Sequence, residues 1–357
     1  MSSVKAFLEK YERRISAAAI LLGFFIDSIT LVRIDFYLTN VLLVAYLLIA
    51  ATAIFVINVH ENGGFKKLSD PAYWWLFVAV QFSFGGLFGR FLIFYSRSGS
   101  FSASWPFLLI LLLLLIGNEF AKKYYTRLLL QIDFFFLALF LFLIFFLPVT
   151  VGYMSDWLFV ASGILSLVIL AGFIKILTKV LPGRITQHRT NIVVSVLLIF
   201  IAVNVLYFTN VIPPIPLSLR SSGVYHSLTV SNSVYRATHE ESSFFDFFTW
   251  TETVHIRPGD PVYVYSAIFA PTNFGASVAH RWEQYDEVTK KWVTAALVPF
   301  PVVGGQDRGY RGYSFKTNPA EGPWRVIIQT PRGQEIGRVS FEIKYVNSLP
   351  LLVQETL

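Results

Sequence analysis

The chain has 357 residues, of which 55% are hydrophobic and only 14% are charged, and its mean hydropathy is +0.58. Soluble domains carry about 25% charged residues, so this composition excludes an ordinary soluble protein of this length. Residues 1–214 hold 16 Lys and Arg against 9 Asp and Glu, which accounts for the net charge of +7. A nucleic-acid-binding protein concentrates its basic residues on one folded domain, so no nucleic-acid partner is expected.

The chain contains no cysteine. Disulfides, thiol nucleophiles and cysteine-based metal sites are therefore excluded. The histidines show no spacing typical of a metal site, and no cofactor is predicted. The first apolar run lacks a clear small-residue cleavage site, so we expect it to remain as an uncleaved anchor.

Long apolar runs dominate the chain up to residue 214. A transmembrane helix needs about 20 apolar residues, and seven runs of that length are present. They lie near residues 15–34, 36–59, 73–95, 102–121, 128–150, 157–177 and 192–212. The sequence therefore predicts an α-helical polytopic membrane domain of about seven transmembrane helices over residues 1–214, with the lipid bilayer as its surroundings.

The loops between these runs alternate in charge. The N-terminus and the second, fourth and sixth loops carry 13 Lys and Arg, whereas the alternate loops carry only Arg33 and Arg97. Short loops rich in Lys and Arg stay in the cytoplasm. We therefore predict a cytoplasmic N-terminus and an extracytoplasmic chain after the seventh span.

Four ionisable residues fall within the apolar runs, where charge is costly and is a functional candidate by default. Asp27 and Arg90 lie at similar depth in the outer half of the membrane, so they are predicted to form an intramembrane ion pair. Such a pair either stabilises the packing of two helices or forms part of a transport or catalytic site. Alternatively, the Arg90 side chain extends to the membrane interface and forms no pair with Asp27. Glu119 and Asp133 lie at cytoplasmic helix ends, where interfacial salt bridges are expected.

A proline-rich hinge at residues 212–216 separates the membrane domain from a strand-like region. Residues 215–257 are interpreted as a linker with an aromatic, membrane-proximal segment at 243–250, and residues 258–357 as an extracytoplasmic β-domain. Strands are predicted near residues 225–237, 261–270, 276–285, 291–299, 309–317, 323–330 and 335–346. In the last of these, Val339, Phe341 and Ile343 alternate with polar residues, which is typical of a half-buried antiparallel strand. The predicted fold is an immunoglobulin-like antiparallel β-sandwich.

Three ordered motifs in this region carry a resemblance to a known family. They are His280-Arg281-Trp282, Arg311-Gly312-Tyr313-Ser314-Phe315-Lys316 and Gly322-Pro323-Trp324-Arg325-Val326, followed by a hairpin from Gly333 to Phe341. Over about residues 258–345 the chain resembles the bacterial domain of unknown function 2914. The resemblance implies a β-domain in the bacterial envelope and a multi-pass protein of the bacterial cytoplasmic membrane, with no established activity.

A candidate binding face mixes aromatic side chains with Arg and Lys, which suit carboxylate and phosphate groups. It consists of Arg308, Tyr310, Arg311, Tyr313 and Lys316, with His280 as a further candidate. An acidic glycan, a lipid headgroup or a peptide carboxylate would fit it; the alternative is a solvated strand edge. Trp282 and Trp324 are expected to pack in the core.

No catalytic residue is predicted. His280 and Ser314 lack the nucleophile elbow of a hydrolase, and Glu283, Asp286 and Glu287 are interpreted as surface charges. The favoured function is a non-enzymatic envelope protein whose outer domain binds a protein partner or an envelope polymer such as a glycan. A membrane transporter or intramembrane enzyme that uses Asp27 and Arg90 is one alternative, and a structural subunit of a membrane complex is another.

Overall fold

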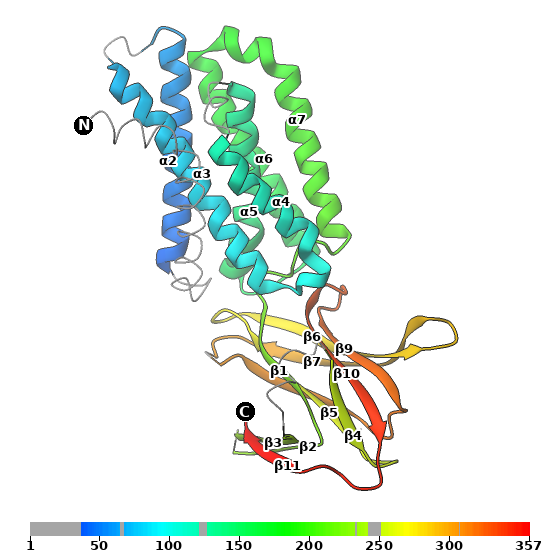
Figure 1. Ribbon diagram of the computed structural model, residues 1–357. Coiled ribbons are helices and arrows are strands. Elements are labelled where there is room, and N and C mark those ends of the chain that lie inside the picture. Colours follow the sequence, from blue (N-terminus) through cyan, green and yellow to red (C-terminus); the bar gives the residue numbers. More distant parts are fainter. Residues whose placement is uncertain (1–36, 65–67, 121–126, 233, 242–250, 307) are drawn as a thin grey trace, which may run out of the picture. The chain divides into compact units, whose positions relative to one another are not determined.

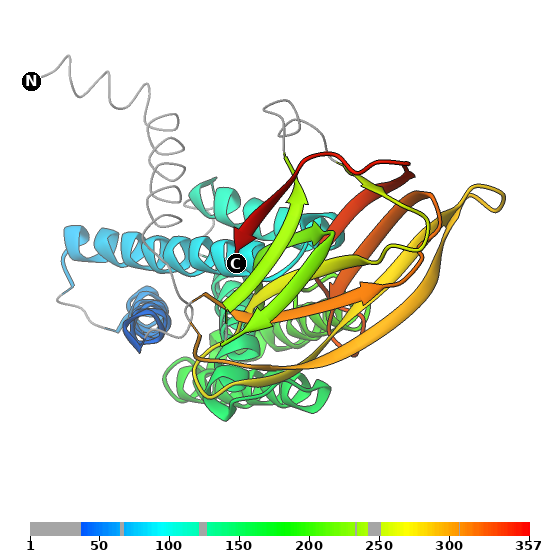
Figure 2. The ribbon, with the colours of Figure 1, turned by 90° about the horizontal axis from the view of Figure 1, so that it is seen from below.

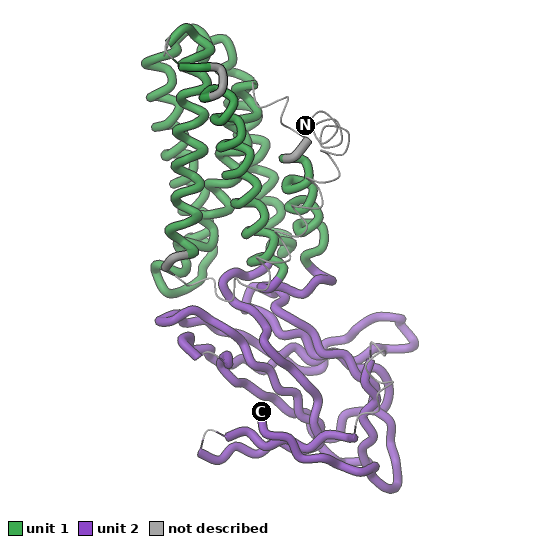
Figure 3. Tube along the Cα trace, turned by 60° about the vertical axis from the view of Figure 1, so that its left-hand side comes forward, with its two compact units in different colours: residues 1–96, 104–212 green, residues 97–103, 213–357 purple. Residues whose placement is uncertain are grey.

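The computed structural model describes residues 37–64, 68–120, 127–232, 234–241, 251–306 and 308–357. The chain divides into two compact units, residues 1–96 with 104–212 and residues 97–103 with 213–357 (Figure 3). Within the described residues, the first unit is built of helices and the second mainly of β-strands (Figure 1).

The described helices are long and apolar enough to cross a membrane. They are α2 (Tyr37–Glu61), α3 (Asp70–Ser98), α4 (Phe101–Phe120), α5 (Leu128–Val151), α6 (Asp156–Val180) and α7 (Pro182–Phe208). They correspond to the second to seventh predicted spans. The first predicted span, residues 15–34, lies outside the described residues, so the structure has six such helices where the sequence predicts seven. Six apolar helices of this length identify a multi-pass membrane protein.

Helix α5 lies at the centre of the helical unit. Of its most apolar window, 61% is buried inside the protein, compared with 22% for α7. The ring of Phe140 on α5 stacks on Phe200 of α7 at 5.6 Å between centroids and lies 5.8 Å from Phe159 of α6. A Cβ at Gly163 of α6 would lie 2.8 Å from Phe200 and 3.0 Å from Phe140. A glycine at this position therefore lets three helices pack around one aromatic cluster.

Helix α7 begins ten residues before the predicted start of the seventh span, at Pro182 instead of residue 192. Its 27 residues make a rod of about 40 Å, longer than the roughly 30 Å hydrocarbon core. The added first turns carry Arg184, which forms an ion pair with Glu61 at the end of α2. The sequence window missed these turns because it detects apolar residues and not helical conformation.

The β-unit contains eleven strands in the described residues. They are β1 (Ser218–Tyr225), β2 (Ser227–Ser231), β3 (Val234–Glu240), β4 (Glu252–Ile256), β5 (Val262–Phe269), β6 (Gly275–Asp286), β7 (Lys291–Val303), β8 (Tyr310–Lys316), β9 (Gly322–Gln329), β10 (Glu335–Tyr345) and β11 (Leu352–Thr356). They form a five-stranded sheet of order β4-β10-β9-β6-β7 and two three-stranded sheets, β1-β5-β8 and β11-β3-β2. The C-terminal strand β11 lies beside β3 (Figure 2).

Two hydrophobic cores hold these three sheets together, and β5 contributes to both. Val262 and Val264 of β5 join Trp282, Trp324 and other side chains between the five-stranded sheet and β1-β5-β8. Tyr265 and Ala267 of β5 pack in a second core with side chains of β2 and β3. Successive residues of a strand point to opposite faces, so β5 is buried on both sides and lies in the middle layer of three.

Several predictions are confirmed. Trp282 and Trp324 are 0% and 1% exposed, with ring centroids 6.4 Å apart. Val339, Phe341 and Ile343 face the first core, as their alternation predicts. The β-rich region and its largely antiparallel sheets are likewise present.

The β-unit differs from the prediction in four respects. A third sheet covers the middle one, and β4 pairs parallel to β10. The single strand predicted at 225–237 is the end of β1 followed by β2 and β3, separated by turns at His226 and Asn232; Asn232 adopts a positive φ of 51°. Residues 215–257, interpreted as a linker, contain β1 to β4, because these short strands are too polar to show a clear alternation. The aromatic segment at 243–250 lies outside the described residues.

Candidate functional site

The imidazole of His280 lies inside the β-unit and ties its two largest layers together. His280 on β6 is fully buried, with Nε2 2.8 Å from the Ser266 hydroxyl of β5 and Nδ1 2.8 Å from the Ser314 hydroxyl of β8. Trp282 Nε1 donates a hydrogen bond of 2.9 Å to the same Ser314 oxygen. Both imidazole nitrogens and the Trp282 N–H have partners when the Ser314 hydroxyl donates to Nδ1 and Nε2–H donates to Ser266. The histidine is therefore a structural side chain.

Burial of this network also decides its chemistry. Desolvation lowers the pKa of His280 to about 4, because the apolar surroundings disfavour the charged imidazolium. Ser314 is only 4% exposed and Ser266 is 0% exposed, so neither hydroxyl is open to a substrate. The candidate binding residue His280 therefore does not reach the surface, and the pair with Ser314 is not a hydrolase site.

Four of the five remaining candidate residues lie on β8, where side chains alternate between the two faces of the sheet. Arg311 and Tyr313 point to the outer face of the middle sheet together with Phe315, opposite Ala267, Tyr265 and Tyr263 of β5. Tyr313 is 40% exposed and Phe315 is 53% exposed. We call the row Arg311, Tyr313 and Phe315 the β8 face.

The third sheet covers one side of the β8 face. The Arg311 guanidinium lies 5.5 Å from the ring centroid of Tyr235 on β3, and the Tyr235 hydroxyl donates a hydrogen bond of 3.2 Å to the Arg311 carbonyl. The Tyr235 and Tyr313 rings meet edge to face at 6.5 Å. Arg311 and Tyr313 are thus held in place by packing, while Tyr313 and Phe315 keep exposed ring surface.

The other candidates are separated from this row. Tyr310 and Lys316 belong to the opposite parity of β8, and the Lys316 ammonium lies 5.9 Å from the Trp324 ring centroid. Arg308 is exposed in the loop before β8. The structure therefore brings together Arg311 and Tyr313, adds Phe315, which sequence reasoning missed, and places Tyr310 and Lys316 elsewhere.

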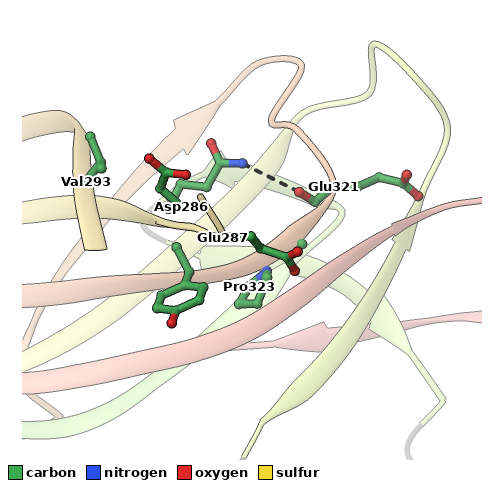
Figure 4. A pocket seen from close by; sticks show the side chains of 8 residues that line it. Asp286, Glu287, Val293, Glu321 and Pro323 are labelled. Atoms are coloured by element: carbon green, nitrogen blue, oxygen red, sulfur yellow. Dashed lines mark hydrogen bonds between the residues drawn. The ribbon is translucent and has the colours of Figure 1, made fainter. Parts of the chain in front are cut away.

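A hollow of about 460 Å³ lies where the β6–β7 hairpin meets the start of β9 (Figure 4). Figure 4 shows Glu287 beside Pro323, with Asp286 and Glu321 to either side. The lining residues are Gln284, Tyr285, Asp286, Glu287, Val293, Glu321, Gly322 and Pro323. The hollow was not predicted, because its residues come from two segments, 284–293 and 321–323, that are far apart in the sequence.

Glu283 precedes Gln284, the first residue that lines the hollow, and its negative charge is neutralised by two arginines. It is 5% exposed and forms ion pairs with Arg281 at 3.0 Å and with Arg325 at 2.6 Å. The Arg325 guanidinium also lies 4.3 Å from the ring centroid of Trp292. A carboxylate held between two guanidinium groups is a poor general acid. The prediction that Glu283 is a surface charge is wrong, because its side chain is buried between these two arginines.

Histidines that are scattered in sequence converge on Glu240 at the end of β3. Its carboxylate lies 3.1 Å from His226 Nε2 and 2.8 Å from His255 Nδ1, and it also accepts the backbone N–H of His255. No group of three ligating side chains in the described ranges is arranged to hold a metal ion. The cluster joins the β1–β2 turn, β3 and β4.

Polar side chains in the helical unit make short-range contacts. Arg90 is 9% exposed, with its guanidinium 5.0 Å from the Tyr46 ring centroid and a 3.4 Å hydrogen bond to the Gly86 carbonyl. Asp133 accepts a 2.7 Å hydrogen bond from Ser195. Asp27 and the side chain of Glu119 lie outside the described residues, so the predicted Asp27–Arg90 pair stays a prediction.

The fold and these surfaces define a class: a multi-pass membrane protein with a C-terminal β-domain. Residues 275–343 match the family model described as a protein of unknown function (DUF2914). The resemblance predicted from the three motifs is therefore confirmed, and the matched segment contains the β8 face, His280 and the whole lining of the hollow. No curated protein matches the chain.

Two solved structures show weak likeness. One is a β-glucosidase from Listeria innocua in complex with glucose, at 10% identity and a TM-score of 0.20, covering 32% of this chain and 16% of that chain. The chain thus spans about a sixth of that enzyme. The other is the Pseudomonas fluorescens alkylpurine DNA glycosylase AlkC bound to DNA containing an abasic site analogue, at 10% identity and a TM-score of 0.22, covering 84% and 97%. Such scores carry no argument about fold or function.

Proposed function

We propose that this protein is a non-enzymatic membrane protein whose β-domain binds a protein partner or polymer of the bacterial envelope. The β8 face, with Arg311, Tyr313 and Phe315 in one row, is the observation that carries the proposal. It combines a guanidinium with two exposed aromatic rings on one strand.

The chemistry of this row suits recognition. Arg and aromatic side chains dominate the binding energy of protein interfaces, because they present large, rigid surfaces and directed donors. Arg311 is stacked on Tyr235, so little side-chain entropy is lost when it contacts a ligand. Residues two apart on a strand are about 6.6 Å apart, which spaces the three side chains for an extended ligand such as a glycan or a peptide with acidic groups.

The proposed location follows from charge. The 13 Lys and Arg of the N-terminus and of the second, fourth and sixth loops, against Arg33 and Arg97 on the other side, favour a cytoplasmic N-terminus. With seven spans, the β-domain then lies outside the bacterial cytoplasmic membrane, where envelope polymers and proteins are accessible.

The test is site-specific photo-cross-linking of the full-length protein in living cells. A p-benzoylphenylalanine at position 313 should give discrete cross-linked products, and these should disappear when Arg311→Ala is added. The matched control is the same amino acid at position 344 on β10, where the native Lys344 side chain is 53% exposed. Equal products from both positions, or none from position 313, would refute binding at the β8 face.

A further inference from the structure

The middle sheet of the β-unit ends at β8, and the outer edge of this strand is open to pairing. All ladder partners of β8 belong to β5. In the described ranges, no backbone group of residues 310–316 bonds to any other strand or loop. The Arg311 carbonyl accepts the Tyr235 hydroxyl, and a carbonyl oxygen keeps a second lone pair. Alternate residues of β8 therefore direct unpaired N–H and carbonyl groups away from β5.

The other described edges of the β-unit carry features that hinder pairing. Strands β2, β4 and β11 have five residues each, and β1 is interrupted by a bulge between Leu219 and Ser221. Strand β7 contains Pro299 and Pro301, which lack a backbone N–H. Short edges, bulges and prolines hinder association between sheet edges. Strand β8 has seven residues in an unbroken register and contains no proline, so it is the described edge best suited to accept a further strand.

The five-stranded sheet offers an apolar surface beside this edge. Ala296, Val298 and Phe300 of β7 lie on the face of their sheet that points toward the middle sheet. All three are only partly buried. The Phe300 ring packs against β8, where a Cβ at Gly312 would lie 2.5 Å from it. The middle sheet thus ends before it covers β7, and a strand added to β8 would cover these apolar side chains.

Positive charge lies at both ends of the open edge. Residues 306–318 contain Arg308, Arg311 and Lys316 and a single acidic residue, Asp307. Arg308 is exposed before β8 and Lys316 is the last residue of β8, and within the described residues neither forms an ion pair. An extended chain rises about 3.4 Å per residue, so a segment of nine residues would span both cations. Acidic residues at the two ends of such a segment would complement them.

We propose that β8 accepts an extended segment of a partner protein as an added β-strand, with acidic residues at both ends of the segment. This inference rests on the proposed function and names the partner as a polypeptide. The backbone ladder supplies the affinity, and alternate side chains supply the specificity. One set packs on Ala296 and Val298, and the other packs on Tyr313 and Phe315, which are 40% and 53% exposed. A glycan presents no backbone ladder of alternating donors and acceptors, so the open edge favours a peptide.

Selection from a library of nine-residue peptides tests the partner's chemistry. The target is the purified full-length protein in lipid nanodiscs, and the peptides carry either Asp or Glu at both ends or Lys at both ends, with random interior residues. Peptides with acidic ends should be enriched. Their affinity should fall at least about twofold in each of Arg308→Glu and Lys316→Glu. Lys344→Glu on β10, where the native side chain is 53% exposed, is the matched control and should leave binding unchanged.

N-methylation of a selected peptide tests the backbone pairing. In an added strand, the N–H groups of alternate residues face β8 and the others face away. Methylation of the first set should weaken binding at least about fivefold, because ladder hydrogen bonds are lost, and methylation of the second set should be tolerated. Equal tolerance or equal loss for both sets, or the absence of enriched acidic peptides, overturns the added strand. Cross-linked products from position 313 without any enriched peptide would overturn this inference and retain the proposed function, with a ligand such as a glycan.

Discussion

At the scale of single residues, the β-domain depends on polar groups whose partners come from distant strands. His280 is a candidate binding residue by sequence, although a histidine two residues from a core Trp shares its face in a strand and is expected to be buried with it. The sequence does not show that Ser266 and Ser314 are the hydrogen-bond partners, because both serines lie in the middle sheet and His280 lies in the five-stranded sheet. The burial of His280 is thus predictable from the sequence, whereas the identity of its hydrogen-bond partners is not.

The buried imidazole predicts a specific dependence of stability on pH. The pKa of His280 is lowered to about 4 in the fold, compared with about 6.5 in an unfolded chain. Its contribution is complete above pH 6.5 and is lost as pH falls through about 4, because only the unfolded state takes up the proton in between. The total loss should be about 3 kcal/mol.

Chemical unfolding of the β-domain in the full-length protein, followed by tryptophan fluorescence from pH 8 to pH 4, measures this effect. His280→Gln removes the titrating group and is the control. The free energy of unfolding of the wild type should fall more steeply below pH 6.5 than that of the variant. Parallel curves would contradict a neutral, buried His280.

Gly304 lies where the structure leaves no room for a larger side chain. A Cβ at this position would lie 1.8 Å from the Pro271 carbonyl oxygen, whereas a Cβ at Gly275, on the paired strand, meets nothing within 4 Å. Gly304→Ala should therefore lower the free energy of unfolding by about 1–3 kcal/mol, because the backbone has to move. Gly275→Ala should change it by less than about 1 kcal/mol. Similar melting temperatures for both variants would show that the β6–β7 end is not packed as described.

At the scale of elements, a hydrophobic pattern predicts which face of a strand is buried, but it does not predict which sheet packs against that face. The last hairpin was predictable because one face of β10 meets a core and the other is polar. Strand β5 is buried on both faces, so its sequence is nearly all apolar and gives no sign that a third sheet lies above it. Strands β1 to β4 show no clear apolar alternation, so the sequence predicts a linker where the structure has one strand of the middle sheet, two strands of the third sheet and the edge strand of the five-stranded sheet.

The alternation of β8 predicts opposite effects for neighbouring residues. Ser314→Ala leaves Trp282 Nε1 and His280 Nδ1 without their Ser314 partner and should cost about 1–3 kcal/mol. Phe315→Ser removes a ring that is 53% exposed and should cost less than half as much. The same Phe315→Ser change should weaken cross-linking from position 313, which Ser314→Ala should leave intact in the folded fraction. A reversed order of stabilities would contradict the register of β8.

Helix α6 offers a matched pair of glycines. Gly163 faces the Phe140 and Phe200 rings, whereas a Cβ at Gly172 meets nothing within 4 Å. Gly163→Ala should lower the thermal stability of the purified protein, because the rings have to separate, and Gly172→Ala should leave it nearly unchanged. Equal melting temperatures in the same detergent would argue against the central aromatic cluster.

At the scale of the whole molecule, composition predicted most of the architecture. Apolar runs of about 20 residues have one stable outcome in a bilayer, a helix with all backbone hydrogen bonds satisfied internally. The change of composition near residue 214 likewise separates the two units of the structure. The candidate site was harder to predict, since the β8 face depends on which strands become neighbours in space.

Cysteine labelling of the full-length protein in intact cells tests the central claim, a multi-pass membrane protein with its β-domain outside the cytoplasm. The chain has no native cysteine, so single substitutions report one position each. Val288→Cys, at a site 92% exposed on the β6–β7 hairpin, should react with a membrane-impermeant maleimide. Gln187→Cys, exposed in the first turns of α7, should react only after the membrane is permeabilised. The opposite pattern would place the β-domain in the cytoplasm and contradict the account.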